Sequence, residues 1–295
     1  MEITKAGFIS IIGKPNAGKS TLLNSILGMK LAITNSKAQT TRHRIMGIHH
    51  HNDCQMVFSD TPGIINPAYK LQEEMMHAVK ESIHDADVIV VLIDLTSPKL
   101  HEDVIEQINK AQCPKIVAIN KMDEGGQEQV AELMEEYGSL ILHDHILPLS
   151  ALHKFNVDNL LDMIYEHCPE HPAYYPEDQL TDRDERFFVA EMVREKILTH
   201  YQQEIPYSIE VVVEAWKDKP NITKIDAVIY CERDSQKVIL IGKKGLGLKR
   251  IGTEARRDIE RFLDRKVYLQ LFVKVREKWR NDEKQLKRFG YNHES

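Results

Sequence analysis

The sequence has few of the features that mark secreted, membrane-spanning or metal-thiolate proteins. Its 295 residues include only four cysteines, and none of them stand in a CxxC spacing. Such a distribution argues against a zinc site or a disulfide framework and is typical of a reducing cytoplasm. No apolar run reaches about 18 residues, which excludes a transmembrane helix. Residues 1–5 lead straight into a strand-like segment, so we expect no secretory signal peptide.

Disorder is also excluded, because 42% of the residues are hydrophobic and 28% are charged. The length exceeds that of the usual single domain and predicts two domains. The net charge of −6 is unevenly distributed. Residues 1–170 carry 14 Lys and Arg against 23 Asp and Glu, whereas residues 237–288 carry 17 against 7. This basic block indicates a site for a polyanion, with a solvated helix face as the alternative.

Short apolar runs alternate with segments of helical periodicity over the first part of the chain. The runs are nearly continuous in Val, Ile and Leu, which is typical of strands buried on both faces. We therefore expect an α/β domain with a mainly parallel sheet, whose ligand binds at the carboxyl ends of the strands. The expected strands are 7–12, 55–59, 87–94, 115–120 and 145–149, and the expected helices are 18–27, 71–83, 100–111, 127–137 and 156–167.

A proline-rich stretch over residues 168–182 disfavours both helix and central strand and predicts a linker. Beyond it the order changes to helix, strand, strand, helix, strand, which predicts a separate α+β domain. These elements are 183–200, 207–216, 222–232, 247–265 and 266–276. We expect a first domain over 1–170, a linker over 171–182 and a second domain over 183–295, closed by a tail helix.

The stretch Gly13-Lys14-Pro15-Asn16-Ala17-Gly18-Lys19-Ser20 matches the phosphate-loop pattern GxxxxGK[ST], between an expected strand and helix. Glycines let successive backbone N–H groups point at the α- and β-phosphates, and the helix N-terminus adds its positive dipole. Lys19 reaches the β- and γ-phosphates, and the Ser20 hydroxyl ligates Mg²⁺. The nucleotide-binding residues expected here are Gly13, Lys14, Pro15, Asn16, Ala17, Gly18, Lys19, Ser20 and Thr21.

Two further motifs fit the phosphate end of such a site. Asp60-Thr61-Pro62-Gly63 follows an expected strand, so that its carboxylate can hold Mg²⁺ and its last N–H can meet a γ-phosphate. Residues 39–43 hold two threonines, of which we favour Thr41 over Thr40 as a further Mg²⁺ ligand. The alternatives are a common turn and a surface loop. The residues expected to act in catalysis are Lys19, Thr41, Asp60 and Gly63, and those expected to bind Mg²⁺ are Ser20, Thr41 and Asp60.

Asn120-Lys121-Met122-Asp123 and Ser150-Ala151 each follow an expected strand and fit the base end of the site. The Asp123 carboxylate can accept hydrogen bonds from the N1–H and N2–H₂ groups of guanine. Adenine lacks this donor pair and leaves the acceptor unpaired. The stem of Lys121 can cover the base, and the Ser150-Ala151 backbone can donate to guanine O6.

Together these motifs resemble a Ras-like GTPase of the translation-factor class over residues 7–152. Ile64 stands where Ras-type enzymes carry a water-orienting glutamine, so the attacking water must be positioned in another way. Asn16 is similar to an asparagine that helps bind K⁺ in related potassium-stimulated GTPases. We hypothesise the same role here, with K⁺ supplying the charge that an arginine finger supplies elsewhere.

In the basic block, Gly242-Lys243-Lys244-Gly245 resembles the GxxG loop of KH domains, which clamps an RNA backbone. The alternative is a simple turn. The apolar run 238–241 before the loop is ambiguous between strand and helix, and the resemblance implies a helix. For Trp279 and residues 289–291 we favour docking of the tail over RNA contacts. The expected RNA-binding residues are Gly242, Lys243, Lys244, Gly245, Lys249 and Arg250.

A P-loop GTPase domain followed by a type II KH domain resembles the Era family of GTPases over nearly the whole chain. The resemblance implies hydrolysis of GTP to GDP with Mg²⁺, binding near the 3′ end of 16S ribosomal RNA, and assistance to 30S subunit assembly. It also implies a cytoplasmic protein with peripheral association with the inner membrane, and we take a monomer as the default. We expect GTP to order residues 32–43 and the segment after Gly63, and so to control RNA binding. Two alternatives are an adaptor GTPase whose second domain binds a protein or lipid, and an RNA-binding protein that never hydrolyses its nucleotide.

Overall fold

The computed structural model describes residues 3–291, so the outermost residues of the two expected domains, 1–2 and 292–295, lie outside it. The chain divides into two compact units. The first unit comprises the chain up to residue 67 together with residues 72–182, and the second comprises residues 68–71 and the chain from residue 183 onward. Within residues 3–291, none of the helices has the length and apolar character that crossing a bilayer requires.

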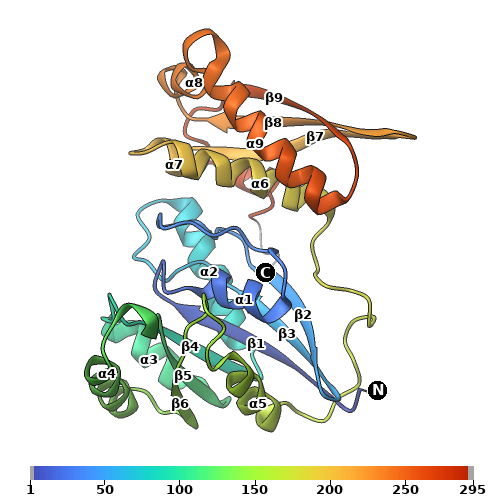
Figure 1. The fold of residues 1–295 in the computed structure, drawn as a ribbon. Helices are drawn as coiled ribbons and strands as arrows, with labels where there is room; N and C mark the ends of the chain where they lie inside the picture. Colours follow the sequence, from blue (N-terminus) through green and yellow to red (C-terminus); the bar gives the residue numbers. More distant parts are fainter. Residues whose placement is uncertain (1–2, 292–295) are drawn as a thin grey trace. The chain divides into compact units, whose positions relative to one another are not determined.

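The first unit is built on a six-stranded sheet in the order β2-β3-β1-β4-β5-β6 (Figure 1). All neighbouring strands are parallel except β2, which pairs antiparallel with β3. The sequence did not predict β2, because its histidine-rich residues lie on an edge and form no continuous apolar run. The strands are β1 (Lys5–Gly13), β2 (Ile45–His51), β3 (Cys54–Asp60), β4 (Val88–Asp94), β5 (Lys115–Asn120) and β6 (His145–Pro148).

Helices cover both faces of this sheet. Residues of α2, α3 and α4 share one buried cluster with alternate residues of β4 and β5, whereas α1 and α5 lie on the other face (Figure 1). All seven residues of β4 are buried as a result, which confirms the expected burial on both faces. The helices are α1 (Lys19–Leu27), α2 (Lys70–His84), α3 (Glu102–Lys110), α4 (Gln127–Leu140) and α5 (Val157–His167), with a 3₁₀ turn η1 (Met122–Glu124).

The expected linker is held against the first unit at the edge of its sheet. The backbone N–H of Ile48 donates to the carbonyl of Leu180 at 2.9 Å, and Gln55 Oε1 accepts from the N–H groups of Tyr174 and Tyr175 at 2.8 and 3.0 Å. The edge strand β2 presents unpaired backbone groups, and residues 180–181 pair with part of it.

The second unit combines a three-stranded sheet with helices in the order expected for a type II KH domain. Strand β8 pairs antiparallel with β7 and parallel with β9. The ambiguous run 238–241 is helical, as the resemblance implied. The elements are α6 (Glu185–His200), α7 (Ile205–Ser208), β7 (Glu210–Lys219), β8 (Ile222–Cys231), α8 (Asp234–Ile241), η2 (Lys243–Gly245), α9 (Leu246–Leu263), β9 (Val267–Val275), η3 (Trp279–Asn281) and α10 (Glu283–Arg288).

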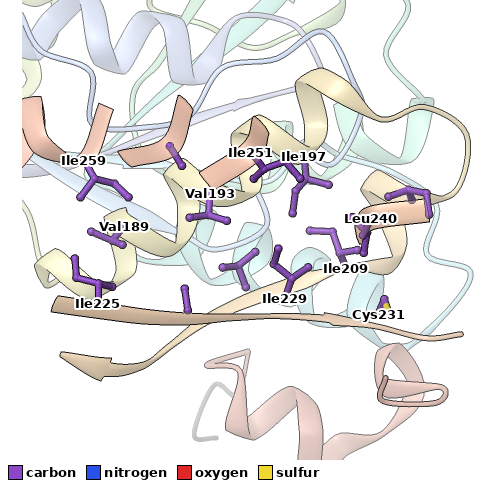
Figure 2. Packing of buried hydrophobic residues seen from close by; sticks show 14 of the residues in the cluster. Val189, Val193, Ile197, Ile209, Ile225, Ile229, Cys231, Leu240, Ile251 and Ile259 are labelled. Carbon is purple, nitrogen blue, oxygen red and sulfur yellow. The ribbon is translucent and has the colours of Figure 1, made fainter. Parts of the chain in front are cut away.

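Branched aliphatic side chains from α6 and α9 meet the sheet in one core, as Figure 2 shows for Val193, Ile251 and Ile229. Burial of each such side chain contributes about 1.5–3 kcal/mol relative to exposure. The C-terminal tail, residues 279–291, packs against the same unit through its own aromatic residues. Trp279 is fully buried, its Nε1 donates to the Ser208 carbonyl at 3.0 Å, and its ring contacts that of Phe289. The expected docking role of these aromatic residues is therefore confirmed.

Candidate functional site

The phosphate loop lies between β1 and α1, at the carboxyl end of a central strand. Gly18 has a φ of +97°, and a Cβ atom there would lie 2.2 Å from Asn120 Nδ2, so only glycine fits. Lys19 Nζ donates to the carbonyls of Gly13 and Lys14 at 3.1 and 2.8 Å. Burial lowers the pKa of Lys19 to about 8, although the Asp60 carboxylate opposes this shift. The ammonium therefore sits inside the loop, where a phosphate would be bound.

Three of the expected metal ligands converge beside this lysine. Ser20 Oγ donates to Asp60 Oδ2 at 2.7 Å and lies 2.8 Å from Thr41 Oγ1. Thr40 instead donates to the Lys37 carbonyl at 2.6 Å, so the geometry favours Thr41 as the ligand. Hydroxyl and carboxylate oxygens are the donors that Mg²⁺ prefers.

One oxygen of the Asp60 carboxylate is available to bind a cation. Its Oδ1 is buried and has no hydrogen-bond partner. Burial raises the pKa of Asp60 to about 6, while the Ser20 hydrogen bond and the charge of Lys19 oppose the rise. The group is mostly ionised at neutral pH, and a bound cation would favour its charged form. The donor set and the unpartnered oxygen fit Mg²⁺.

The DTPG segment packs directly against the phosphate loop. A Cβ atom on Gly63 would lie 2.5 Å from the backbone nitrogen of Pro15, so a larger residue would displace one of the two segments. The N–H of Ile64 donates to the Gly13 carbonyl at 3.2 Å, and its side chain packs against the core shared with α2–α4. Ile64 thus holds the segment in place and offers no polar group to a water molecule.

Asn120 joins the two ends of the site. Its Nδ2 donates to the Ala17 carbonyl at 2.7 Å, and its Oδ1 accepts from the Ala151 N–H at 3.0 Å. The buried carboxamide therefore ties the phosphate loop to the Ser150-Ala151 turn. These bonds make Asn120 a residue that positions both neighbouring loops, and its expected contact with the nucleotide stays a prediction.

The remaining base-end residues form a hydrogen-bonded set. Asp123 accepts from Ser150 Oγ, and this bond is the main reason why the pKa of Asp123 is lowered. Lys121 Nζ pairs with Asp94 Oδ2 at 2.7 Å. Sequence reasoning missed Asp94. This residue ends β4, as Asp60 ends β3 and Asn120 ends β5, so its place at the carboxyl end of a strand could have revealed it.

The phosphate loop and residues 33–41 enclose a small cavity of about 90 Å³. Asn16 bridges the two segments, because its Nδ2 donates to the Ser36 carbonyl at 2.6 Å. The Asn16 side chain is exposed. A monovalent cation can therefore reach it from solvent, beside the expected position of the phosphates.

The second unit carries a groove beside the GxxG loop. Gly242 has a φ of +71°, and Lys243 and Lys244 are exposed. Lys249 and Arg250 are also exposed, and Arg250 Nε lies 3.3 Å from Glu254 Oε1. Sequence reasoning missed several groove residues, although residues 249, 252, 253 and 256 share one face of α9. The groove measures about 330 Å³ and is lined by Gly245, Leu248, Lys249, Gly252, Thr253, Arg256, Leu269, Gln270 and Leu271.

Comparison with known proteins connects both regions to one family. Residues 8–121 match the model of the 50S ribosome-binding GTPase family, and residues 204–280 match that of the KH domain. GTPase Era of Clostridium kluyveri is 45% identical over 290 residues, covering 97% of this chain and 99% of the relative. GTPase Era of Geotalea uraniireducens is 47% identical over 290 residues, covering 97% and 98%.

Two solved structures are similar over nearly the whole chain. A crystal structure of Era in complex with MgGDPNP and nucleotides 1506–1542 of 16S ribosomal RNA superposes with a TM-score of 0.94 at 40% identity, covering 98% of this chain and all of that one. A variant of Aquifex aeolicus Era bound to GDP·AlF₄⁻ gives a TM-score of 0.93 at 40% identity, with the same coverage. The expected fold class, a P-loop GTPase domain followed by a KH domain, is therefore confirmed.

Proposed function

Because this chain belongs to the Era family of GTPases, we propose that it hydrolyses GTP to GDP and phosphate with Mg²⁺ and binds the 3′ region of 16S ribosomal RNA. In this proposal the nucleotide site lies within residues 1–170 and the RNA site within residues 183–295, joined by residues 171–182. The observation that carries the nucleotide site is the convergence of Ser20, Thr41 and Asp60 beside Lys19.

Each group has a definite task in hydrolysis. Mg²⁺, when bound, neutralises charge on the β- and γ-phosphates, and Ser20, Thr41 and Asp60 would hold it. Lys19 contacts the same phosphates and stabilises the charge that develops on them. In this proposal the N–H of Gly63, which packs against Pro15 of the phosphate loop, meets the γ-phosphate.

Guanine selection rests on Asp123. Like any carboxylate of ordinary pKa it is ionised at neutral pH, and the Ser150 hydrogen bond lowers its pKa further, so it presents only acceptors to the N1–H and N2–H₂ donors of guanine. Asp94 holds Lys121 at the same edge, where its stem can lie over the base. The bonds of Asn120 fix the Ser150-Ala151 turn relative to the phosphate loop.

The RNA proposal rests on the groove beside α9 and on the exposed lysines of the GxxG loop. Backbone phosphates would meet Gly242, Lys243, Lys244 and Gly245, and bases would enter the groove. KH domains clamp about four nucleotides in this way. The structure of a relative with nucleotides 1506–1542 of 16S ribosomal RNA supports the same class of ligand here.

We further propose that the nucleotide state controls RNA binding and that this control serves 30S subunit assembly. GTP would order residues 32–43 and the segment after Gly63, as in other GTPase switches. Residues 68–71 follow that segment closely and belong to the second unit, which gives a covalent route between the two sites. Cytoplasmic location, a monomeric state and peripheral association with the inner membrane stay predictions of the sequence.

The experiment for the enzymatic proposal is a GTPase assay with RNA present, in KCl and in NaCl. We expect turnover in KCl to be about tenfold faster or more, because K⁺ beside Asn16 would stabilise transition-state charge. The Lys19→Ala variant should show no turnover, and Asn16→Ala should lose the difference between the salts. Equal rates in the two salts would contradict the K⁺ proposal alone, whereas no turnover in either would contradict the GTPase proposal.

A further inference from the structure

Two histidines and a glutamate meet in the first unit, away from the two sites described above. His145 is the first residue of β6, and Glu166 and His167 end α5. One ligand atom of each lies within 4.8 Å of those of the other two, and residues 3–291 contain no other such group of three His, Cys, Asp or Glu. The nucleotide site lies at the carboxyl ends of the strands, whereas His145 begins its strand. We propose that His145, Glu166 and His167 bind a divalent transition-metal ion, for which Zn²⁺ is the best match.

The spacing of the ligand atoms fits such an ion. His145 Nε2 lies 3.4 Å from Glu166 Oε2, which is longer than a good hydrogen bond. Two ligands bound to Zn²⁺ at a tetrahedral angle lie about 3.4 Å apart, given the usual metal–ligand distances. The other pairs, within 4.8 Å, would reach this separation by closing about 1.4 Å at most. Glu166 is 63% exposed and can shift toward His167, whereas the two imidazoles would close their own separation by rotating their rings.

His167 supplies an independent reason to expect a ligand. Its Nε2 is buried and has no hydrogen-bond partner, a state that folded proteins usually avoid. Its ring centroid lies 5.2 Å from that of His145, so both imidazoles line the same small space. Metal-binding histidines use one ring nitrogen for the metal and the other for a neighbouring acceptor or water. A bound ion would order both rings at once.

The ligand types decide which metal fits. Mg²⁺ and Ca²⁺ prefer oxygen donors, and soft ions such as Cu(I) prefer thiolates, whereas two imidazoles and one carboxylate suit divalent transition metals, among which Zn²⁺ takes a tetrahedral set of this kind. Three protein ligands leave a fourth position for water, and the exposed fraction of Glu166 leaves room for it. Because the ligands come from β6 and α5, the ion would clamp the start of the strand to the end of the helix.

The test is a Zn²⁺ titration of the full chain, saturated with Mg²⁺ and GDP so that zinc does not enter the nucleotide site. A competing chromogenic chelator reports the affinity, and thermal unfolding reports the clamp. We expect one Zn²⁺ at this site and a higher unfolding temperature in its presence. His145→Gln and His167→Gln should each weaken zinc binding about tenfold or more and abolish the thermal shift.

Two controls separate this site from other histidines. His84→Gln changes a 91% exposed histidine on α2, and His49→Gln changes the histidine run of β2, so both should bind zinc as the wild type does. Unchanged GDP affinity in every variant shows that the first unit is folded. The proposal is overturned if the wild type binds no zinc, if His145→Gln and His167→Gln bind it normally, or if either control variant loses it equally.

Discussion

The Asp123→Asn variant is expected to lose its preference for GTP and to bind xanthosine triphosphate instead. The wild-type carboxylate accepts both donors of the guanine edge, whereas an Asn side chain presents an acceptor and a donor. Xanthine carries a carbonyl where guanine carries its amino group, so it matches the variant. A site built to hydrogen-bond its substrate discriminates by about 10⁴-fold against a mismatched analogue. The expected result is an inversion of preference of at least about 100-fold.

Competition of GTP and xanthosine triphosphate for a fluorescent nucleotide would measure this inversion. Asn still accepts a hydrogen bond, so the bond from Ser150 can persist and the loop should keep its structure. Glu124→Gln is the matched control, since it neutralises the neighbouring exposed carboxylate in η1. An unchanged preference for guanine in Asp123→Asn would show that another residue reads the base.

The second large effect is expected in the GxxG loop, where Lys243→Glu together with Lys244→Glu should remove RNA binding. Both side chains are exposed, so their reversal costs the fold little. Each phosphate contact contributes about one unit to the slope of the logarithm of the binding constant against the logarithm of the salt concentration. Reversal of two charges should weaken binding about 100-fold at moderate salt and flatten that slope by about two. GTP hydrolysis without RNA should stay near the wild-type rate.

A charge-matched control distinguishes a local contact from a general change of charge. Lys217 and Lys219 are exposed near the end of β7, and their double replacement by Glu should change RNA affinity much less. Gly242→Asp should also abolish RNA binding, because it adds negative charge at a φ of +71°. RNA affinity that persists in the loop variants, or falls equally in the control, would contradict the assignment of this loop.

The elements that the sequence predicted best are strands buried on both faces. The strands β1, β3, β4 and β5 are buried on both faces and therefore read as continuous apolar runs. The edge strand β2 has one partner strand and a polar, half-buried sequence, so no periodicity revealed it. Its pairing with residues 180–181 of the expected linker depends on contacts far apart in the chain, which local patterns do not encode.

The candidate site was predictable to the extent that it follows local motifs. Ser20, Thr41 and Asp60 were expected together, and the structure brings them within hydrogen-bonding distance. Asp94 was not expected, because its role exists only through its ion pair with Lys121, across two strands. The groove residues Leu269, Gln270 and Leu271 were missed for a similar reason, since β9 contributes one wall, whereas Gly252, Thr253 and Arg256 share a face of α9 with Lys249 and could have been found from helical spacing.

The most direct test of nucleotide-controlled RNA binding is the affinity for a short RNA copied from the 3′ end of 16S ribosomal RNA. It should be measured with GDP and with a non-hydrolysable GTP analogue, each at two salt concentrations. We predict tighter binding in the GTP-analogue state, and a loss of affinity at higher salt in both states, because phosphate contacts release counterions. Equal affinity in the two nucleotide states would contradict the proposed control, and no binding in either state would contradict the RNA assignment itself.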